Sequence, residues 1–299
     1  MDQDNAPQTS GDSATLRNRI AATEDFVDIA ERLTAVGDLE WVAVESDFRL
    51  LAVNTSLRRQ LESIQAAVML CQQGLGHLAV AFVRASLEDV MYLGFFVSLD
   101  REDSQHLFKT MGTWDHLRSL LAQREYVGDE AMHTLWYSQE FLNWAELLKD
   151  QTRSELKQLQ KKYRWSGGIL PAGDWIAERS GHGDLYGYLH AATSRALHFS
   201  AGEILRRGWG EPSGKVITDK PEFREHLAAF ALDQLWRLFL DTLKAAEPLI
   251  EAAGLSSDPA LDFEEMKPIL DRLLAIGRVP LVHAHEWNLT PEGPLGTSS

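Results

Sequence analysis

The distribution of proline constrains the fold of this chain more than any other feature of its sequence. Of ten prolines, only Pro7 precedes Pro171, so residues 8–170 contain none of the residue that most strongly breaks a helix. Apolar side chains in this stretch recur at intervals of three and four residues, which is the spacing of one face of a helix. We therefore predict long helices and an all-α fold.

We expect eight or so helices arranged as a multi-helix bundle. Their expected ranges are about 16–33, 48–69, 75–99, 102–124, 129–163, 184–199, 221–254 and 262–276. An irregular insertion rich in Gly and Pro interrupts the bundle near 165–219, where the short run KVITD is either a strand or an extended connector. We predict one helical domain over 15–288, between a disordered N-terminus over 1–14 and a disordered tail over 289–299.

The composition limits the class of protein. Acidic residues outnumber basic ones by 44 to 29, which gives a formal net charge of -15. This charge argues against a uniformly basic surface that binds nucleic acid. Cys71 is the only cysteine, so the sequence excludes an intramolecular disulfide and a cysteine-based zinc site. The acidic, polar start lacks the basic and apolar regions of a signal peptide. We therefore expect a soluble, cytoplasmic protein.

The apolar run over 75–99 is long enough to cross a membrane, but it carries charges at its middle. Arg84, Glu88 and Asp89 would each cost about 2.5–3.5 kcal/mol at the centre of a bilayer. We therefore predict a buried core helix and no membrane partner.

Arg84 and Glu88 lie four residues apart on this predicted helix, so they share a face. Charged groups among apolar side chains must be paired or hydrogen-bonded, which predicts an ion pair between them. Two interpretations stay open: the pair is structural, or it is catalytic, because buried ionic groups also mark reactive sites.

A second candidate site is a polar stripe on the predicted helix over 184–199. Its members follow one another at steps of four and therefore line one face. They are Tyr186, His190, Ser194 and His198. Apolar residues form the adjacent face, so the stripe borders the core. These side chains are either an ordinary polar boundary or a ligand-binding surface, since histidine serves in both roles.

Short patterns on these two helices resemble a family of bacterial helical proteins of unknown function. The family pairs an R-S-x-x-E helix with a later Y-x-x-x-x-x-x-x-S-x-x-x-H helix. The matching patterns here are R-A-S-L-E at 84–88, Trp165 before a Gly-rich turn, and Tyr186 followed by S-R-A-L-H at 194–198.

The resemblance covers about residues 47–200, and Ala85 stands where the family has serine. It implies an all-helical fold in which Arg84, Glu88 and His198 converge. The family has no established activity to carry over.

A neighbouring comparison is the HEPN superfamily, whose helical domains often act as metal-independent ribonucleases through an arginine followed at short distance by a histidine. Arg101 with His106, and Arg278 with His283 or His285, have a fitting spacing. About two such pairs are expected by chance among 20 arginines and 10 histidines. Their presence therefore does not support a HEPN motif. A ribonuclease would instead combine Arg84 with His198 from another helix.

Several chemistries lose support because their motifs are absent. The sequence has no phosphate-binding G-x-x-x-x-G-K-[ST] loop, no H-E-x-x-H, no G-x-S-x-G and no G-x-G-x-x-G opening a βαβ unit. We therefore expect no cofactor and no bound metal.

The acidity is unevenly distributed. Residues 151–224 contain 12 basic and 8 acidic residues, a balance of +4, in a chain whose total is -15. This window holds the polar stripe together with Arg206 and Arg207, so we assign those two arginines to a local anion site. RNA or another anionic ligand is the partner expected there.

Nine tryptophans are many for 299 residues, and we expect core packing to explain most of them. Trp136 and Trp144 lie on one bulky apolar helix face. Tryptophans that stay exposed would indicate a partner surface or a homodimer.

Two hypotheses of function follow. The first is a noncatalytic binding or interaction protein, which the resemblance connects to bacterial stress or phage defence. The second is a HEPN-like, metal-independent ribonuclease or toxin that uses Arg84 and His198, with Glu88 orienting the arginine.

Overall fold

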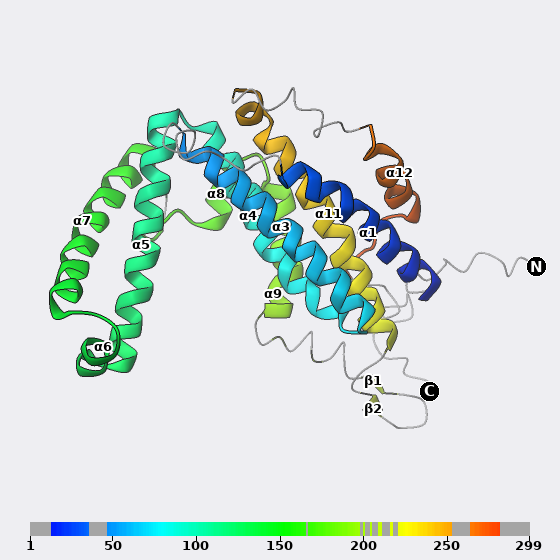
Figure 1. The fold of residues 1–299 in the computed structure, drawn as a ribbon, viewed down its shortest axis with the longest axis horizontal. Helices are drawn as coiled ribbons and strands as arrows, with labels where there is room; N and C mark the ends of the chain where they lie inside the picture. The colour runs from blue at the N-terminus through cyan, green and yellow to red at the C-terminus, as the bar shows by residue number, and fades with distance from the viewer. Residues whose placement is uncertain are drawn as a thin grey trace, which may run out of the picture. The chain divides into compact units, whose positions relative to one another are not determined.

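The structure, a computed structural model, confirms the all-α bundle (Figure 1). It describes residues 13–35, 47–165, 167–197, 200, 204, 209–210, 216–217, 221–252 and 264–281. Outside the helices, β1 (Trp209–Gly210) pairs antiparallel with β2 (Val216–Ile217), so part of KVITD is a strand. Most of the predicted disordered N-terminus over 1–14 and all of the tail over 289–299 lie outside the described residues.

The described residues divide into two compact units. α3 (Phe48–Gln72) and α4 (Val80–Ser98) contribute residues to both of them. The first unit also contains α1 (Ser13–Ala35), the 3-10 helix η1 (Gly76–Ala79), α9 (Gly183–Leu197, from its second residue), β1, β2, α11 (Pro221–Ala252) and α12 (Lys267–Ile276). The second contains α5 (Arg101–Val127), α6 (Asp129–Leu135), α7 (Gln139–Tyr163) and α8 (Gly173–Arg179). One domain over 15–288 stays a prediction.

The core of the first unit forms around α11, which contacts η1 and α1. Phe26 of α1 packs against Trp236 and meets Phe239 edge-on, with ring centroids 5.6 Å apart in the second pair. A buried amide also joins three helices: Gln60 Nε2 of α3 donates to Thr242 Oγ1 of α11 at 2.7 Å and to the carbonyl of Ser86 on α4 at 3.3 Å. Aromatic packing and the two hydrogen bonds donated by Gln60 together specify how the helices align.

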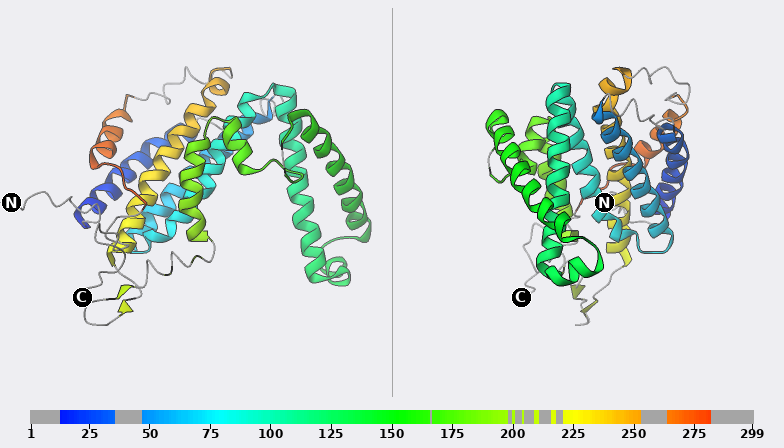
Figure 2. Two further views of the ribbon diagram at one scale, coloured as in Figure 1. Left: turned by 180° about the vertical axis from the view of Figure 1, so that it is seen from behind. Right: turned by 60° about the vertical axis from the view of Figure 1, so that its left-hand side comes forward.

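The second unit is built on α5 and α7, which run side by side and are connected through α6 (Figures 1 and 2). The side chain of Asp100 caps the N-terminus of α5 by accepting from Asp103 N at 2.9 Å. Lys162 and Tyr163 at the far end of α7 donate to the Asp103 carboxylate, and these hydrogen bonds lower the pKa of Asp103. The contacts tie the first turn of α5 to the last turn of α7.

The helix predicted over 129–163 is in fact two helices, because Ser138 interrupts it. The Ser138 hydroxyl accepts from Phe141 N at 3.2 Å and so starts α7 as an N-cap. The irregular segment also contains a helix that the periodicity did not indicate, α8. Its Trp175 packs edge-on against Phe95, with ring centroids 5.4 Å apart, so tertiary contact stabilises this seven-residue helix. α11 begins at Pro221, as predicted.

The tryptophans are only partly explained by core packing. Trp114, Trp165 and Trp236 are buried. Trp136 and Trp144 are about half exposed, so core packing does not account for these two. Trp136 follows the end of α6 whereas Trp144 belongs to α7, so the prediction that they share one helix face is wrong. The second unit therefore carries an apolar surface that its own helices do not cover.

We expect Cys71 to be chemically inert in the folded protein, because burial raises the pKa of its thiol to about 12. At pH 8 about one thiol in ten thousand would then be ionised, and only the thiolate attacks iodoacetamide. Mass spectrometry should show labelling about a thousandfold slower in buffer than in denaturing urea. Equal rates in the two conditions would contradict the partial burial of this thiol.

Candidate functional site

The predicted ion pair on α4 is present. Arg84 Nε donates to Glu88 Oε1 at 2.7 Å, as their spacing of four residues requires. The pair lies at a partly exposed edge of the helix: the side chain of Arg84 is 20% exposed and that of Glu88 is 44% exposed. Asp89, the next residue, is the charged group of this helix that is buried.

α9 brings a second predicted site residue to this pair. The guanidinium carbon of Arg84 lies 5.7 Å from the ring centroid of Tyr186, close enough for a cation–π contact. The Tyr186 ring in turn lies 4.7 Å from the ring of His190, one helical turn further along α9. Arg84, Glu88, Tyr186 and His190, which we call the α4–α9 site, therefore meet within the first unit.

The geometry leaves one edge of the Arg84 guanidinium available. Glu88 accepts a hydrogen bond from its Nε, and its Cζ lies over the ring of Tyr186. Within the described ranges, no hydrogen bond involves the two terminal nitrogens, Nη1 and Nη2. A fixed guanidinium with two parallel donors matches the oxygens of a phosphate or carboxylate.

The remaining predicted site residues are placed less completely. Ser194 is half-buried, one turn beyond His190 on α9. His198, Arg206 and Arg207 lie outside the described residues. The structure therefore brings together four of the predicted residues and does not test the convergence of His198 with Arg84.

Sequence reasoning missed a second ion pair beside the site. Arg59 of α3 donates both Nε, at 3.1 Å, and Nη2 to the carboxylate of Asp89. Burial raises the pKa of Asp89, and the hydrogen bonds from Arg59 oppose that shift. The position of Asp89 in the middle of an apolar helix was the available signal, but nothing in the sequence identifies Arg59 as its partner.

The basic window over 151–224 is divided between the two units, at residue 183. Arg153, Lys157 and Lys162 belong to α7 in the second unit, whereas the polar stripe belongs to the first. The net charge of the window therefore does not describe one site. Arg84, which comes from outside the window, contacts the stripe at Tyr186 and can supply a positive charge there.

The described part of the chain contains no group of three or more His, Cys, Asp or Glu side chains placed to hold a metal ion. None of its helices combines the length and the apolar character that crossing a bilayer demands.

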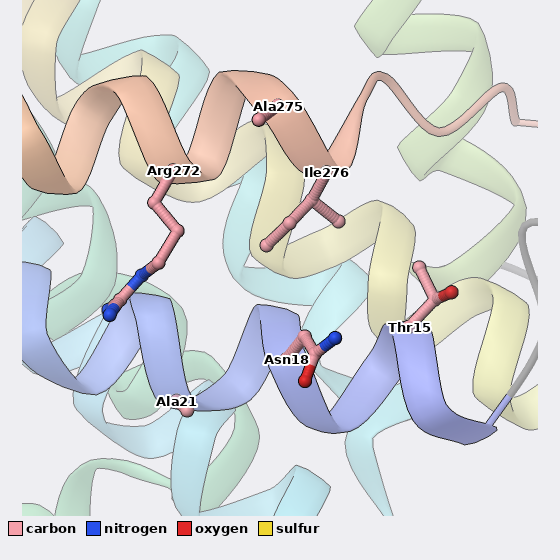
Figure 3. A pocket seen from close by; sticks show the side chains of 6 residues that line it. All are labelled: Thr15, Asn18, Ala21, Arg272, Ala275 and Ile276. Carbon is pink, nitrogen blue, oxygen red and sulfur yellow. The ribbon is translucent and has the colours of Figure 1, made fainter.

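A surface groove of about 480 Å³ lies between α1 and α12 (Figure 3). Its lining consists of Thr15, Asn18, Ala21, Arg272, Ala275 and Ile276. Arg272 extends across to α1 and forms an ion pair with Asp25, so its charge is neutralised by that carboxylate. The groove contains no residue of the α4–α9 site.

The comparisons with known proteins identify a family. The model of a family of unknown function, DUF5677, matches residues 51–216, more than half of the chain, and this range includes α4 and α9. No curated protein and no solved structure matches the chain. The match supports the expected membership of an uncharacterised family, and the HEPN relationship stays a prediction. The chain therefore belongs to DUF5677, a family of unknown function.

Proposed function

We propose that this protein is a noncatalytic binding protein that takes the phosphate or carboxylate group of an anionic ligand at the α4–α9 site. The observation that carries the proposal is the fixed guanidinium of Arg84, held at Nε by Glu88 at 2.7 Å. Its Nη1 and Nη2 would donate in parallel to two oxygens of the ligand. A link to stress or phage defence rests on the sequence resemblance alone and stays a prediction.

The neighbouring side chains fit such a ligand. The rings of Tyr186 and His190 lie next to the guanidinium and are inclined to each other by 46°, so a base or another flat group could stack on one of them. Glu88 neutralises part of the local positive charge, so binding depends on paired hydrogen bonds more than on simple attraction. This favours a ligand that presents two oxygens in one plane.

Isothermal titration calorimetry with three probes tests the proposal: inorganic phosphate, acetate, and a single-stranded RNA of about ten nucleotides. We expect the wild type to bind at least one of them. Arg84→Ala should weaken that binding by roughly 10- to 100-fold, because charge-assisted hydrogen bonds contribute about 1.5–3 kcal/mol. Arg84→Lys should lose most of it too, since an ammonium cannot form the parallel pair.

A matched control is Arg179→Ala. Arg179 also lies over an aromatic ring, 5.1 Å from the centroid of Trp175, but it belongs to α8 in the second unit. Its removal should leave binding unchanged. Binding that is equally strong in Arg84→Ala, or no binding of any probe, would contradict the proposal.

The second candidate is the HEPN-like ribonuclease, and the orientation of Arg84 by Glu88 also favours it. His198 would accept the proton of a ribose 2′-hydroxyl as this oxygen attacks the adjacent phosphorus, and the 5′-oxygen of the next nucleotide would leave with a proton from water. Arg84 would stabilise the charge on the phosphoryl oxygens. The products are a 2′,3′-cyclic phosphate and a free 5′-hydroxyl.

RNA integrity separates the two candidates. An enzyme should cleave RNA without added metal and should slow growth on expression, and both effects should disappear in Arg84→Ala and in His198→Ala. A protein that binds RNA through Arg84 and leaves it intact is a binding protein. If His198→Ala still binds RNA, His198 does not contribute to binding, and its role is restricted to the cleavage step.

A further inference from the structure

A line of positively charged side chains follows the C-terminal half of α7. Three of them are separated by steps of four residues, so they share one face of the helix, and the fourth is the residue that caps its C-terminus. The line, here named the α7 basic stripe, consists of Arg153, Lys157, Lys161 and Arg164. All four residues are exposed. Each step of four residues advances about 6 Å along the helix axis, so the stripe presents its cations at a regular spacing.

Neighbouring carboxylates do not neutralise these charges. Across the described residues, no ion pair includes a member of the stripe, whereas Lys162 in the same turn pairs with Asp103. Glu155 lies on the opposite side of the helix, two residues from both Arg153 and Lys157. Residues 151–164 contain five basic residues and one acidic residue, a net charge of +4, in a chain whose total is -15. The stripe is therefore a local concentration of unneutralised positive charge.

The helix dipole explains only one end of the stripe. Cations in the last turn of a helix are stabilised by the unpaired carbonyl groups there, which accounts for Lys161 and Arg164. This effect falls off within one turn, whereas Lys157 and Arg153 lie six and ten residues before the last residue of α7, Tyr163. Like charges four residues apart also destabilise a helix, so the regular spacing has a cost that an anionic partner would remove.

The surroundings of the stripe select among anionic partners. Over residues 148–165, no large apolar side chain is exposed. The stripe therefore has no apolar side chain to insert into a lipid surface, and no exposed aromatic ring on which an unpaired base could stack. Duplex nucleic acid needs neither of these, because its bases are stacked within the duplex and its phosphates form a dense, regular line of negative charge.

We propose that the α7 basic stripe contacts the phosphate backbone of duplex nucleic acid, without reading its base sequence. Lysine and arginine donate to phosphate oxygens, and the release of counterions from the duplex favours binding. Glu146, on the N-terminal half of α7, lies about 10 Å along the axis from Arg153, which is about one Debye length, and it is already paired with Arg124. This inference does not depend on the α4–α9 site, which belongs to the other unit.

Fluorescence anisotropy of the full chain with a DNA duplex of about 16 base pairs, at about 50 to 200 mM KCl, tests the contact. Four phosphate contacts predict a slope of about 3.6 for log Kd against log salt, so binding should weaken by about 150-fold over this range. Lys157→Ala/Lys161→Ala should reduce the slope to about 1.8 and weaken binding by roughly tenfold or more at the lowest salt concentration. A duplex of scrambled sequence should bind equally well.

A matched control removes the same amount of charge elsewhere. Arg118→Ala/Lys244→Ala replaces two exposed cations, on α5 and α11, and should leave the slope and the affinity unchanged. Circular dichroism of both double variants establishes that they fold. An RNA duplex of the same sequence, titrated in parallel, identifies which of the two duplexes is preferred, and a preference for either one supports the contact.

The outcomes also separate this proposal from the one at the α4–α9 site. Arg84→Ala should bind the duplex as the wild type does, whereas the titrations with phosphate and acetate report on Arg84 alone. A protein that binds no duplex at 50 mM salt overturns the proposal, as does equal binding by Lys157→Ala/Lys161→Ala. Tighter binding of the single strand than of the duplex overturns it too, and so does binding of vesicles containing phosphatidylserine in place of the duplex.

Discussion

Asp233→Ala is expected to lower the free energy of unfolding by about 3–5 kcal/mol. Asp233 is fully buried in α11 and its Oδ1 accepts from Arg19 Nη1 at 3.2 Å and from Arg237 Nη2 at 3.1 Å. Its removal would leave two arginines facing each other, one of them buried without a counter-charge. Chemical denaturation followed by circular dichroism measures the loss.

The burial of Arg19 explains the size of this effect. Burial lowers the pKa of Arg19, an effect opposed by the charge of Asp233 and reinforced by that of Arg237. Arg19 Nη2 also donates to the carbonyl of Gly277 at 2.8 Å, and Asp233 Oδ2 accepts from Val279 N at 3.5 Å. The network therefore connects α1, α11 and the segment after α12.

Two further variants separate the loss of a charge from the loss of packing. Arg19→Met combined with Asp233→Leu removes both members of the buried pair and should cost less than Asp233→Ala alone, because no orphaned guanidinium remains at position 19. Asp25→Ala breaks the exposed pair with Arg272 and should cost less than about 1 kcal/mol. If the exposed and the buried variants cost the same, the account of this network is wrong.

Gly76→Ala is expected to destabilise the protein by about 1–3 kcal/mol, through overpacking. Gly76 opens η1, which packs on α11, and a Cβ added there would lie 2.7 Å from Ala228 Cβ and closer still to the sulfur of Cys71. Atoms at that distance must move, and the backbone of Cys71 is close enough to resist. Thermal unfolding of the purified variant measures the change.

Gly112→Ala is the matched control, with the opposite sign. Gly112 is exposed in α5 and a Cβ there would meet nothing within 4 Å. Alanine should therefore stabilise the protein by about 0.5–1 kcal/mol, through its higher helix propensity. Adding Cys71→Ala to Gly76→Ala should recover part of the loss, since it removes the sulfur but leaves Ala228. A neutral Gly76→Ala would mean that η1 and α11 are not in close contact.

Contacts within one helix could be predicted from the sequence, because the period of a helix determines which residues share a face. Arg84 with Glu88 and Tyr186 with His190 are both separated by four residues, and both pairs are in contact. The start of α11 at Pro221 follows from an equally local rule. The break at Ser138 was missed, because its hydroxyl competes with a helical pattern that otherwise continues through it.

Contacts between different helices could not be predicted from the sequence. Arg59 with Asp89, Arg84 with Tyr186 and Arg19 with Asp233 join residues that are 30 to 214 positions apart, and no periodicity connects them. α8 forms at seven residues through the packing of Trp175, which the sequence of the helix itself does not show.

The sequence by itself determined that the chain is helical, which residues share each helix face, and that Arg84 and Glu88 would pair, because proline placement and helical period act over a few residues. The tertiary structure decided which faces are covered. Trp114 and Trp144 are both tryptophans on long helices, yet the first is buried and the second is exposed. The difference depends on which neighbouring helix packs against each side, and that follows from the summed free energy of all packing contacts rather than from any local pattern.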